Sequence, residues 1–438
     1  MSIKKIKLTS IFILSVVLYC FFTYDLRPYF FWDTYNSGAF RIINMLPLRS
    51  MVGLMVIFSG LLCFRKKTTR NMAICALVIP LIVGTSLLIN SKYMFSLNWL
   101  IPIATMIYVL STSDVKEKSF VYFYNTFLAL LIIPILVYIL VHIGINVPYK
   151  LLDSQEDIKQ ATNVYYKIYP LACQWTDPWN EAYRALRLCG VYSEPGVVGT
   201  FCAMFLCSEN FQLKNNWKNI IILIGGILSF SLAFYIVIFF YIFWRAVNTN
   251  WKYGFAIVLI IVLYFIFINI SFDNPVISNF QSRLIINSSG LSGNNRTNTR
   301  YDVVFGSLGS NGLLDYIFGR GFGAIEDTLS ANSVDGASYK NLIFNYGFVG
   351  FGLQIIWYFA ISLLISSGKG KRARQFCLGM CLIMCANMYQ RPTMFGFQYL
   401  VIMLGADYCF INGIKASKQK LFDIGKNRTV GGSACAGD

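Results

Sequence analysis

The chain has 438 residues, of which 56% are hydrophobic and only 13% are charged, and its formal net charge is +17. This composition excludes an ordinary soluble domain, because apolar runs of about 20 residues are long enough to cross a bilayer core of about 30 Å. Backbone groups in lipid must pair within their own segment, so such runs are expected to be helices. The predicted fold class is therefore an all-α polytopic membrane protein.

Apolar runs follow one another along the whole chain. The first, 8–25, lacks a small-residue cleavage site and is interpreted as a retained span rather than a signal peptide. The run 219–247 is long for one span and short for two, and Gly225, Gly226, Ser229 and Ser231 offer a break point, so a hairpin of two short or kinked helices is expected. About 12 spans result, with both termini cytoplasmic. The other runs lie at 50–64, 71–90, 95–111, 119–145, 194–208, 254–271, 343–366, 375–390 and 395–412.

Basic clusters separate many of these runs, and they explain the net charge. Membrane proteins collect Lys and Arg in their cytoplasmic loops. With the clusters inside, the inside segments hold 22 Lys and Arg against 5 Asp and Glu, and the outside segments hold 15 against 14. The charge excess therefore follows from topology, and no nucleic-acid partner is expected. The clusters are KKIK, RKKTTR, DVKEK, KNNWK, GKGKRAR and KASKQKLFDIGKNR.

Two long segments are predicted to lie outside, at 146–193 and 272–342, and loops of that length are usually functional. Cys173 and Cys189 fall in or beside the first one. If that side is oxidising they could pair, and two free thiols are the alternative. The expected organisation is 1–145 and 194–271 as helices, 146–193 and 272–342 as the large loops, 343–412 as the C-terminal helices, and 413–438 as a cytoplasmic tail whose last residues, NRTVGGSACAGD, read as disordered.

Arginine is over-represented outside. Of the outside basic residues 10 of 15 are Arg, whereas only 6 of 22 are Arg inside. The guanidinium forms a bidentate fork for anions such as carboxylate or pyrophosphate, although pairing with outside acids is an alternative. The second segment carries Arg283, Arg296, Arg300 and Arg320. The same segment carries glycines that would permit close backbone approach to a ligand, namely Gly306, Gly309, Gly312, Gly319, Gly321 and Gly323. Its stretch YDVVFGSLGSNGLLDYIF is expected to form an amphipathic helix at the membrane interface.

The stretch RALRLCGVYSEPGVVGTF places Arg184, Arg187 and Glu194 at the outer mouth of a span. Ionisable groups at this depth are costly and usually functional. Pro195 suits the first turn of a helix, and Glu194 would also favour the positive end of the helix dipole, so a capping role is the alternative for Glu194. Tyr192 is a candidate for stacking on a sugar, as are Trp175 and Trp179, and chance placement is the alternative.

Metal chemistry is not indicated. The single histidine, His142, lies near the outer end of an apolar run and is expected to be packed and hydrogen-bonded, and no His, Cys or Asp cluster has metal-ligand spacing. No cofactor is expected. An enzyme of this composition would work with arginines and one carboxylate.

Several motifs appear in order on the outside. An Arg and a Gly precede SEPG at the entry of a span, and later come R…SGNNR…R, then FGRGFG, then KNLIFNYGFVGFGLQ. Together, over roughly 184–355, they resemble the O-antigen polymerase family of Gram-negative inner membranes. The resemblance implies a fold related to GT-C membrane glycosyltransferases. It implies polymerisation of undecaprenyl-diphosphate-linked repeat units on the periplasmic face, in contact with membrane lipid and with a chain-length regulator protein as a further partner.

The resemblance also implies site residues. Essential arginines of the family map onto Arg187, Arg283 and Arg300, with Arg184 and Arg296 as competitors. Arg187–Gly199 and Arg300–Gly312 share one spacing, which is longer than the family pattern, so the assignment stays open among these arginines. Related ligases carry a His near the entry of the next span, where this chain reads ASYKNLIFNYG.

The expected catalytic group is thus Arg187, Arg300, Arg283 and Glu194, and the expected substrate-binding group is Arg184, Arg296, Arg320 and Tyr192. Glu194 is expected to orient Arg187, and the alternative is a general base. Two other functions remain open, an O-antigen ligase-like transferase and a flippase for the same lipid-linked oligosaccharide. A transporter would be expected to show related halves and charges near the midplane, and only Asp407 lies deep in a predicted span.

Overall fold

A computed structural model provides the structure of the chain. It describes residues 3–23, 26–31, 45–63, 69–153, 165–176, 187–248, 252–273, 275–287, 290–291, 299–310, 312–332, 334, 336, 338–388 and 391–431.

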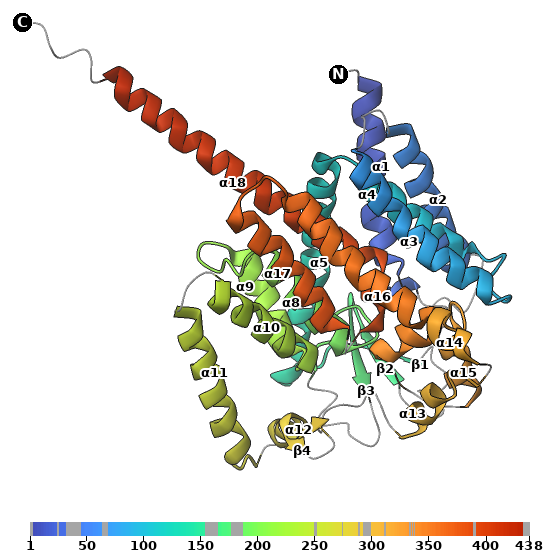
Figure 1. The fold of residues 1–438 in the computed structure, drawn as a ribbon. Helices are drawn as coiled ribbons and strands as arrows, with labels where there is room; N and C mark the ends of the chain where they lie inside the picture. Colours follow the sequence, from blue (N-terminus) through green and yellow to red (C-terminus); the bar gives the residue numbers. More distant parts are fainter. Residues whose placement is uncertain are drawn as a thin grey trace, which may run out of the picture.

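Helices occupy the predicted apolar runs (Figure 1). Four helices in the described part are long and apolar enough to cross a membrane: α3 (Arg70–Ile89), α5 (Ser113–His142), α16 (Tyr339–Ser366) and the apolar part of α18 (Phe397–Gly431), up to Ile414. Shorter apolar helices take the other runs, which agrees with a membrane protein, and the number of spans stays a prediction. They are parts of α1 (Ile3–Phe21), α2 (Met45–Cys63), α4 (Leu100–Leu110), α8 (Pro195–Ser208), α9 (Trp217–Leu228), α10 (Leu232–Asn248) and α11 (Lys252–Asn269). Helix α17 (Lys371–Asn387) covers the run at 375–390 and is less apolar than these.

The expected break inside 219–247 is confirmed. Helix α9 ends at Leu228 and α10 begins at Leu232. The Ser229 hydroxyl donates to the Gly226 carbonyl at 2.6 Å, and Phe230 adopts a positive φ of 43°. A side-chain bond back to the helix backbone competes with the next turn, so the chain leaves the helix at the serines.

Helix α8 lies at the centre of the bundle, packed against α9 and α10 and in contact with α17 and α18. Every residue from Val197 to Ser208 is buried. A Cβ on Gly199 would fall onto Ser231, so the glycine permits α8 to approach the α9–α10 break closely. Aromatic rings of α5 pack edge-to-face on α8, with the centroids of Phe123 and Phe205 5.3 Å apart.

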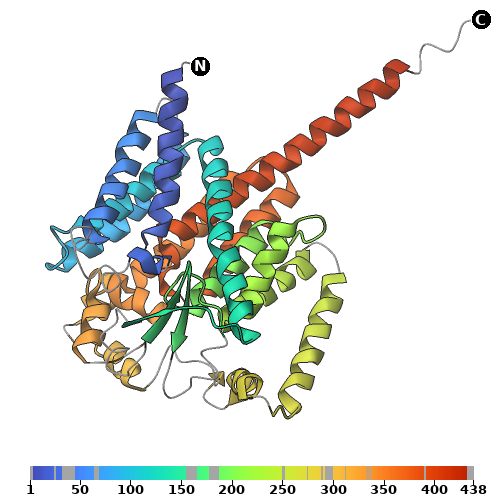
Figure 2. The ribbon, with the colours of Figure 1, turned by 180° about the vertical axis from the view of Figure 1, so that it is seen from behind.

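The two long segments lie at the same end of the bundle, which we call the loop end. The views of Figures 1 and 2 place the start of α1 and the end of α18 at the opposite end. This arrangement agrees with the predicted placement of both termini on one side and both large loops on the other. Helix α18 continues to Gly431, so the expected tail is helical up to that residue, including the first part of the stretch expected to be disordered.

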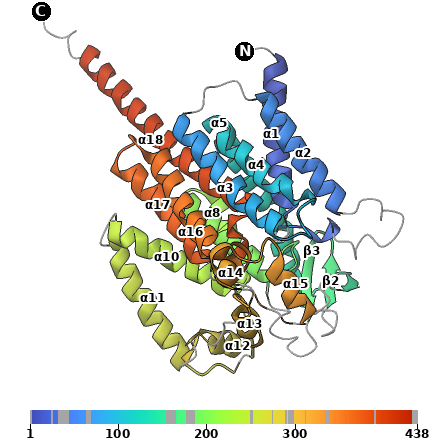
Figure 3. The ribbon, with the colours of Figure 1, turned by 45° about the vertical axis from the view of Figure 1, so that its right-hand side comes forward.

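A three-stranded antiparallel sheet covers part of the loop end (Figure 3), and the all-α prediction is wrong in this detail. It contains β1 (Lys150–Asp153), β2 (Tyr165–Tyr169) and β3 (Ala172–Thr176). In β2 the side chains of Tyr166 and Ile168 are buried, and they lie on one face because strand side chains alternate. Short period-two patterns of this kind are easily masked by the strong hydropathy of the neighbouring spans.

The second long segment forms several short elements instead of one amphipathic helix over 301–318. Two helices, α13 (Thr299–Gly306) and α14 (Leu313–Phe318), replace it, because Gly309 and Gly312 take φ values of 89° and 118° that end a helix. The remaining elements are α12 (Pro275–Leu284), β4 (Ile286–Asn287), β5 (Gly290–Leu291) and α15 (Ala324–Ala331). A small core joins the segment to α16 and is formed by Tyr301, Val304, Leu308, Ile325, Leu329, Val334, Ile343 and Phe344.

Candidate functional site

The entry of α8 holds a partly buried ion pair. Glu194 directly precedes the helix, and its carboxylate accepts a hydrogen bond of 3.0 Å from the Arg391 guanidinium. Arg391 follows α17 and precedes the short helix η3 (Pro392–Phe395), and its backbone N–H donates to the Asn387 carbonyl at 2.8 Å. The Arg391 side chain is 10% exposed and that of Glu194 is 21% exposed. Charge is therefore concentrated where α8 and α18 both begin.

This pair differs from the expected partner of Glu194. Seven residues separate Glu194 from Arg187, and sequence proximity suggested that the carboxylate orients that arginine. The carboxylate instead pairs with Arg391, which the fold brings from a different helix. Glu194 is the N-cap residue of α8, at the positive end of the helix dipole as the alternative supposed, although its side chain accepts no hydrogen bond from the described first turn.

Arg391 itself is a site residue that sequence reasoning missed. It is one of the ten arginines counted outside, and it lies in a short turn between the predicted spans 375–390 and 395–412. It lies outside the two long loop segments in which functional residues were expected. The sequence does carry a signal, which is a charged residue in a short turn between two apolar runs. Such a residue is either exposed to solvent or paired with an opposite charge, and the burial of Arg391 in the structure requires an ion-pair partner.

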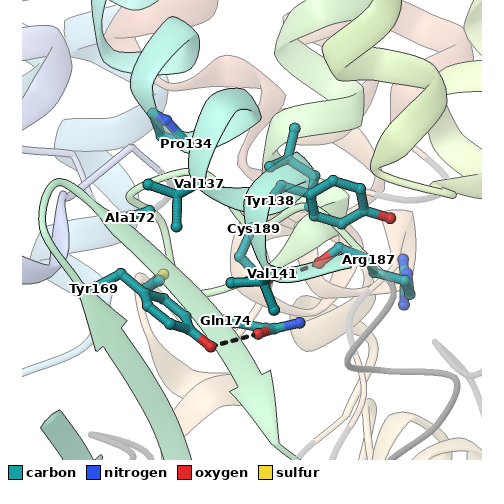
Figure 4. Close-up of a pocket in the computed structure, with 11 residues that line it drawn as sticks. Pro134, Val137, Tyr138, Val141, Tyr169, Ala172, Gln174, Arg187 and Cys189 are labelled. Carbon is teal, nitrogen blue, oxygen red and sulfur yellow. Dashed lines mark hydrogen bonds between the residues drawn. The ribbon is translucent and has the colours of Figure 1, made fainter. Parts of the chain in front are cut away.

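Arg187 lies beside this entry and lines a small cavity, shown in Figure 4. Its Nε donates to the Ser229 carbonyl at 3.1 Å, and the next backbone N–H, of Leu188, donates to the Leu228 carbonyl at 2.9 Å. These bonds fasten the segment before α8 to the α9–α10 break. Arg187 is thus held at the loop end by the backbone that the break exposes.

The cavity is walled by α5, β3 and the segment that carries Arg187. Tyr138 from α5 and Gln174 from β3 both line it (Figure 4). The Tyr169 hydroxyl donates to the Gln174 side-chain oxygen at 3.0 Å, and burial raises the pKa of Tyr169. Tyr169 therefore stays a protonated donor at neutral pH. The wall offers a guanidinium, an amide and phenols as hydrogen-bonding groups, and the space they enclose has room for about one water molecule.

Tyr192 does not occupy the place expected for a sugar-stacking residue. It is fully buried, and its ring stacks on Phe127 with centroids 6.0 Å apart and planes 12° apart. A stacking platform needs at least one reachable ring face, and this ring has no exposed surface. The expected substrate-binding role of Tyr192 is therefore replaced by a packing role beneath the entry of α8.

Arg320 is engaged by the protein itself. Its Nε donates to the Asp315 carboxylate at 2.9 Å, its Nη2 donates to the Ser310 hydroxyl at 2.6 Å and to the Ser307 carbonyl, and its guanidinium lies over the Phe344 ring. The guanidinium thus connects α14 to the turn after α13. These contacts fit a structural tie rather than the expected contact with a diphosphate.

The glycines of FGRGFG approach protein backbone, not the ligand that was expected. A Cβ on Gly319 would lie 2.5 Å from the Gly347 nitrogen, and one on Gly321 would lie 2.6 Å from the Asn90 nitrogen. Gly347 has a φ of 68° and kinks α16, which frees carbonyls of the preceding turn. The N–H groups of Arg320 and Gly321 donate to the carbonyls of Phe344 and Asn345 at 2.8 and 3.1 Å. The motif therefore supplies hydrogen-bond donors to the carbonyls beside the kink in α16.

Of the other expected arginines, the structure describes the side chain of Arg300 alone. Arg300 is exposed on α13, which docks on the start of α16 through the Tyr301 hydroxyl, donating to Asn341 Oδ1 at 2.5 Å. Burial raises the pKa of Tyr301 to about 12, so this donor is protonated at neutral pH. Arg283 belongs to α12, and its side chain lies outside the described residues, as do Arg184, Trp179 and Arg296.

His142 ends α5, where its Nδ1 lies 2.6 Å from the Tyr138 carbonyl and its ring stacks on Tyr138 with centroids 4.0 Å apart. The expected hydrogen bond is present, although the residue is exposed. Within the described ranges, no group of three or more His, Cys, Asp or Glu side chains is arranged to hold a metal ion.

Comparisons with protein-family models, with curated proteins and with solved structures give no match to this chain. The class that the fold itself defines is a mostly helical protein with the apolar helices of a membrane protein and a charged group at the entry of a buried helix.

Proposed function

We propose that the chain is a membrane glycosyltransferase that polymerises undecaprenyl-diphosphate-linked O-antigen repeat units. It would reside in the inner membrane of a Gram-negative bacterium with the loop end facing the periplasm. The motif resemblance over 184–355 supports the reaction class. The observation that carries the proposal is the Arg391–Glu194 pair at the entry of α8, next to the segment that holds Arg187.

The proposed reaction transfers the growing glycan to an incoming unit. A hydroxyl of the incoming lipid-linked sugar attacks the anomeric carbon of the growing chain, a new C–O bond forms, and the bond to the diphosphate breaks. Undecaprenyl diphosphate leaves with the electron pair. Negative charge develops on that leaving group, and fixed guanidinium donors in a water-poor site stabilise it.

The described residues suggest two roles at this site. Arg187 and Arg391 supply the positive charge, and Glu194 keeps Arg391 in place through their hydrogen bond. Alternatively, Glu194 accepts the proton of the attacking hydroxyl. Arg300 and Arg283 belong to the second loop segment and remain proposed contacts for the diphosphate or the sugar chain, as do Arg184 and Arg296.

The experiment is a glycan-length assay in cells that lack the native gene and carry the wild type or a variant. The variants are Arg187→Ala, Arg187→Lys, Arg391→Ala, Arg391→Lys, Arg300→Ala and Arg300→Lys, with membrane levels measured. Loss of one charge-stabilising donor typically lowers a rate by about 10²–10³. We expect a ladder with the wild type and single repeat units on the lipid A core with the Arg187 and Arg391 variants. The Lys variants should fail as well, because an ammonium lacks the planar fork.

Arg372→Ala is the matched control, because Arg372 is exposed at the start of α17, far from the loop end. Its ladder should equal that of the wild type. If cells without the gene attach no repeat unit to the core, the protein acts in ligation or in transport of the lipid-linked unit, and the polymerase proposal is wrong.

A further inference from the structure

Two parts of the first loop segment are joined across the wall of the Arg187 cavity. Strand β3 contributes Cys173, and the segment before α8 contributes Cys189. The backbone N–H of Cys173 donates to the Gly190 carbonyl at 2.8 Å, so β3 is paired with this segment at the residue next to Cys189. The backbone contact therefore brings the two cysteines to adjacent positions on neighbouring chain segments.

Their side chains meet inside the protein. Both line the same cavity, Cys173 is 4% exposed, and Cys189 is fully buried. The Cys173 thiol also donates to the Tyr192 carbonyl at 2.9 Å. Burial raises the pKa of the Cys173 thiol well above its usual range, and the neighbouring Cys189 raises it further. Both cysteines are free thiols in the structure, buried and lining one cavity from adjacent chain segments, so they are placed as neighbours that an oxidant could join.

The geometry points to a disulfide between Cys173 and Cys189, formed by thiol–disulfide exchange with an oxidised protein disulfide. The two thiols lose two protons and two electrons, one S–S bond forms between them, and the disulfide of the oxidant is reduced to two thiols. An extracytoplasmic compartment supplies oxidants of this class. This inference depends on the placement of the loop end outside the cytoplasm, and it does not depend on the proposed reaction.

The bond would act on the entry of α8. It would close the chain between 173 and 189, and a loop of this length restricts the unfolded state enough to stabilise the fold. Cys189 lies between Arg187 and Glu194 in the chain. The sheet would then be covalently attached to the segment that carries both charged groups, and Arg187 would be held from one side by Ser229 and from the other by the sheet.

Mass spectrometry of the full chain, purified in detergent after expression with its native targeting, tests the inference. Free thiols are blocked with iodoacetamide under denaturing conditions before trypsin digestion. Cleavage after Lys167, Arg184, Arg187 and Lys214 releases Cys173 on peptide 168–184 and Cys189 on peptide 188–214. We expect these peptides to be recovered as one linked species that separates after reduction. Recovery of Cys173 and Cys189 as alkylated residues on separate peptides overturns the inference.

Peptide 188–214 also contains Cys202 and Cys207, which are buried in α8. Cys202→Ser and Cys207→Ser are therefore the matched controls, and each should leave the linked species intact. Cys173→Ser and Cys189→Ser should abolish it. Each of these two changes should lower the thermal midpoint of the purified protein, and the double change should lower it no further than the larger single effect, since one bond is lost in all three. A linked species that persists in Cys189→Ser overturns the assignment of the partner.

Discussion

Glu194 and Arg391 are separated by 197 positions in the chain and form a hydrogen-bonded ion pair in the structure. Their contact is the residue-level interaction with the clearest energetic consequence. A charge that leaves water pays a desolvation cost, and its partner offsets that cost only while both are present. Removal of one partner deprives the other of this charged hydrogen bond while it stays largely buried. The limited exposure of both side chains places the pair between a solvated surface contact and a fully buried one.

We predict that Glu194→Ala and Arg391→Ala each destabilise the protein by about 2–3 kcal/mol, somewhat less than a fully buried pair would lose. The double variant should lose less than the sum of the single losses, because both single changes remove the same hydrogen bond. Thermal unfolding in detergent measures all three. Lys92→Ala is the control, since Lys92 pairs with Asp327 while 62% exposed and its loss should change stability far less than the loss of either buried partner. Additive losses would show that the two side chains do not interact.

Arg320 provides a second test at the residue scale. Its guanidinium is held by Asp315, Ser310 and the Ser307 carbonyl, so Arg320→Ala and Asp315→Ala should each lower stability by about 1–3 kcal/mol through lost charged hydrogen bonds. Arg300→Ala, on an exposed side chain of α13, should leave stability within about 0.5 kcal/mol of the wild type. Denaturation curves distinguish the two arginines. An equal loss for both would contradict the role of Arg320 as a structural tie.

At the scale of elements, the kinked helix α16 joins the second loop segment to the bundle. Gly347 interrupts the helix, and Asn345 just before it connects three elements. Its carbonyl accepts from the Ser86 hydroxyl of α3 at 2.9 Å, and its side-chain oxygen accepts from the Ile325 N–H at 3.0 Å. The kink thus places polar backbone groups where the neighbouring segment can satisfy them.

We predict that Gly347→Ala strongly reduces the amount of folded protein in the membrane. A Cβ at this position would fall onto the Ile317 carbonyl, and the positive φ of 68° is unfavourable for any other L-residue. Gly352→Ala is the matched control in the same helix, because a Cβ there meets nothing within 4 Å. That change should be neutral or stabilise α16 by up to about 1 kcal/mol. Similar protein levels for the two variants, measured by immunoblot and thermal unfolding, would refute a required kink.

At the scale of the whole molecule, the sheet and helices α12–α15 share one end of the bundle, and the start of α1 and the end of α18 share the other (Figures 1 and 2). The apolar helices between α1 and α18 run between these two ends (Figures 1 and 2). An even number of membrane crossings, as the positive-inside assignment of the basic clusters requires, stays a prediction.

Reporter fusions test this topology. Alkaline phosphatase inserted after Leu171 in the β2–β3 turn, or after Ser310, should be active, and green fluorescent protein inserted at the same sites should be dark. The turn at Gly368–Gly370, between α16 and α17, should give the opposite result. If the same reporter is active both at the Gly368–Gly370 turn and at the insertion sites after Leu171 and Ser310, the two ends of the bundle do not lie on opposite sides of the membrane.

The positions of the apolar helices, though not all of their limits, could be predicted from local pattern alone. Hydropathy placed the apolar runs, and the serines at 229 and 231 predicted the break between α9 and α10, because these signals act within a few residues of one another. The glycines at 309 and 312 carried a local signal as well, which the apolar character of 301–318 concealed. Arg187 and Glu194 were found from the sequence because they stand at the visible boundary of an apolar run.

What the tertiary structure decided is which groups meet. Glu194 pairs with Arg391 rather than Arg187, FGRGFG closes the kink of α16 rather than a ligand site, and Tyr192 packs on Phe127 rather than facing outward. The sequence alone determined where the chain becomes apolar and where it carries charge, since both depend on a residue and its neighbours. The partners of those charges come from helices far apart in the chain, and only their packing brings the atoms within hydrogen-bonding distance.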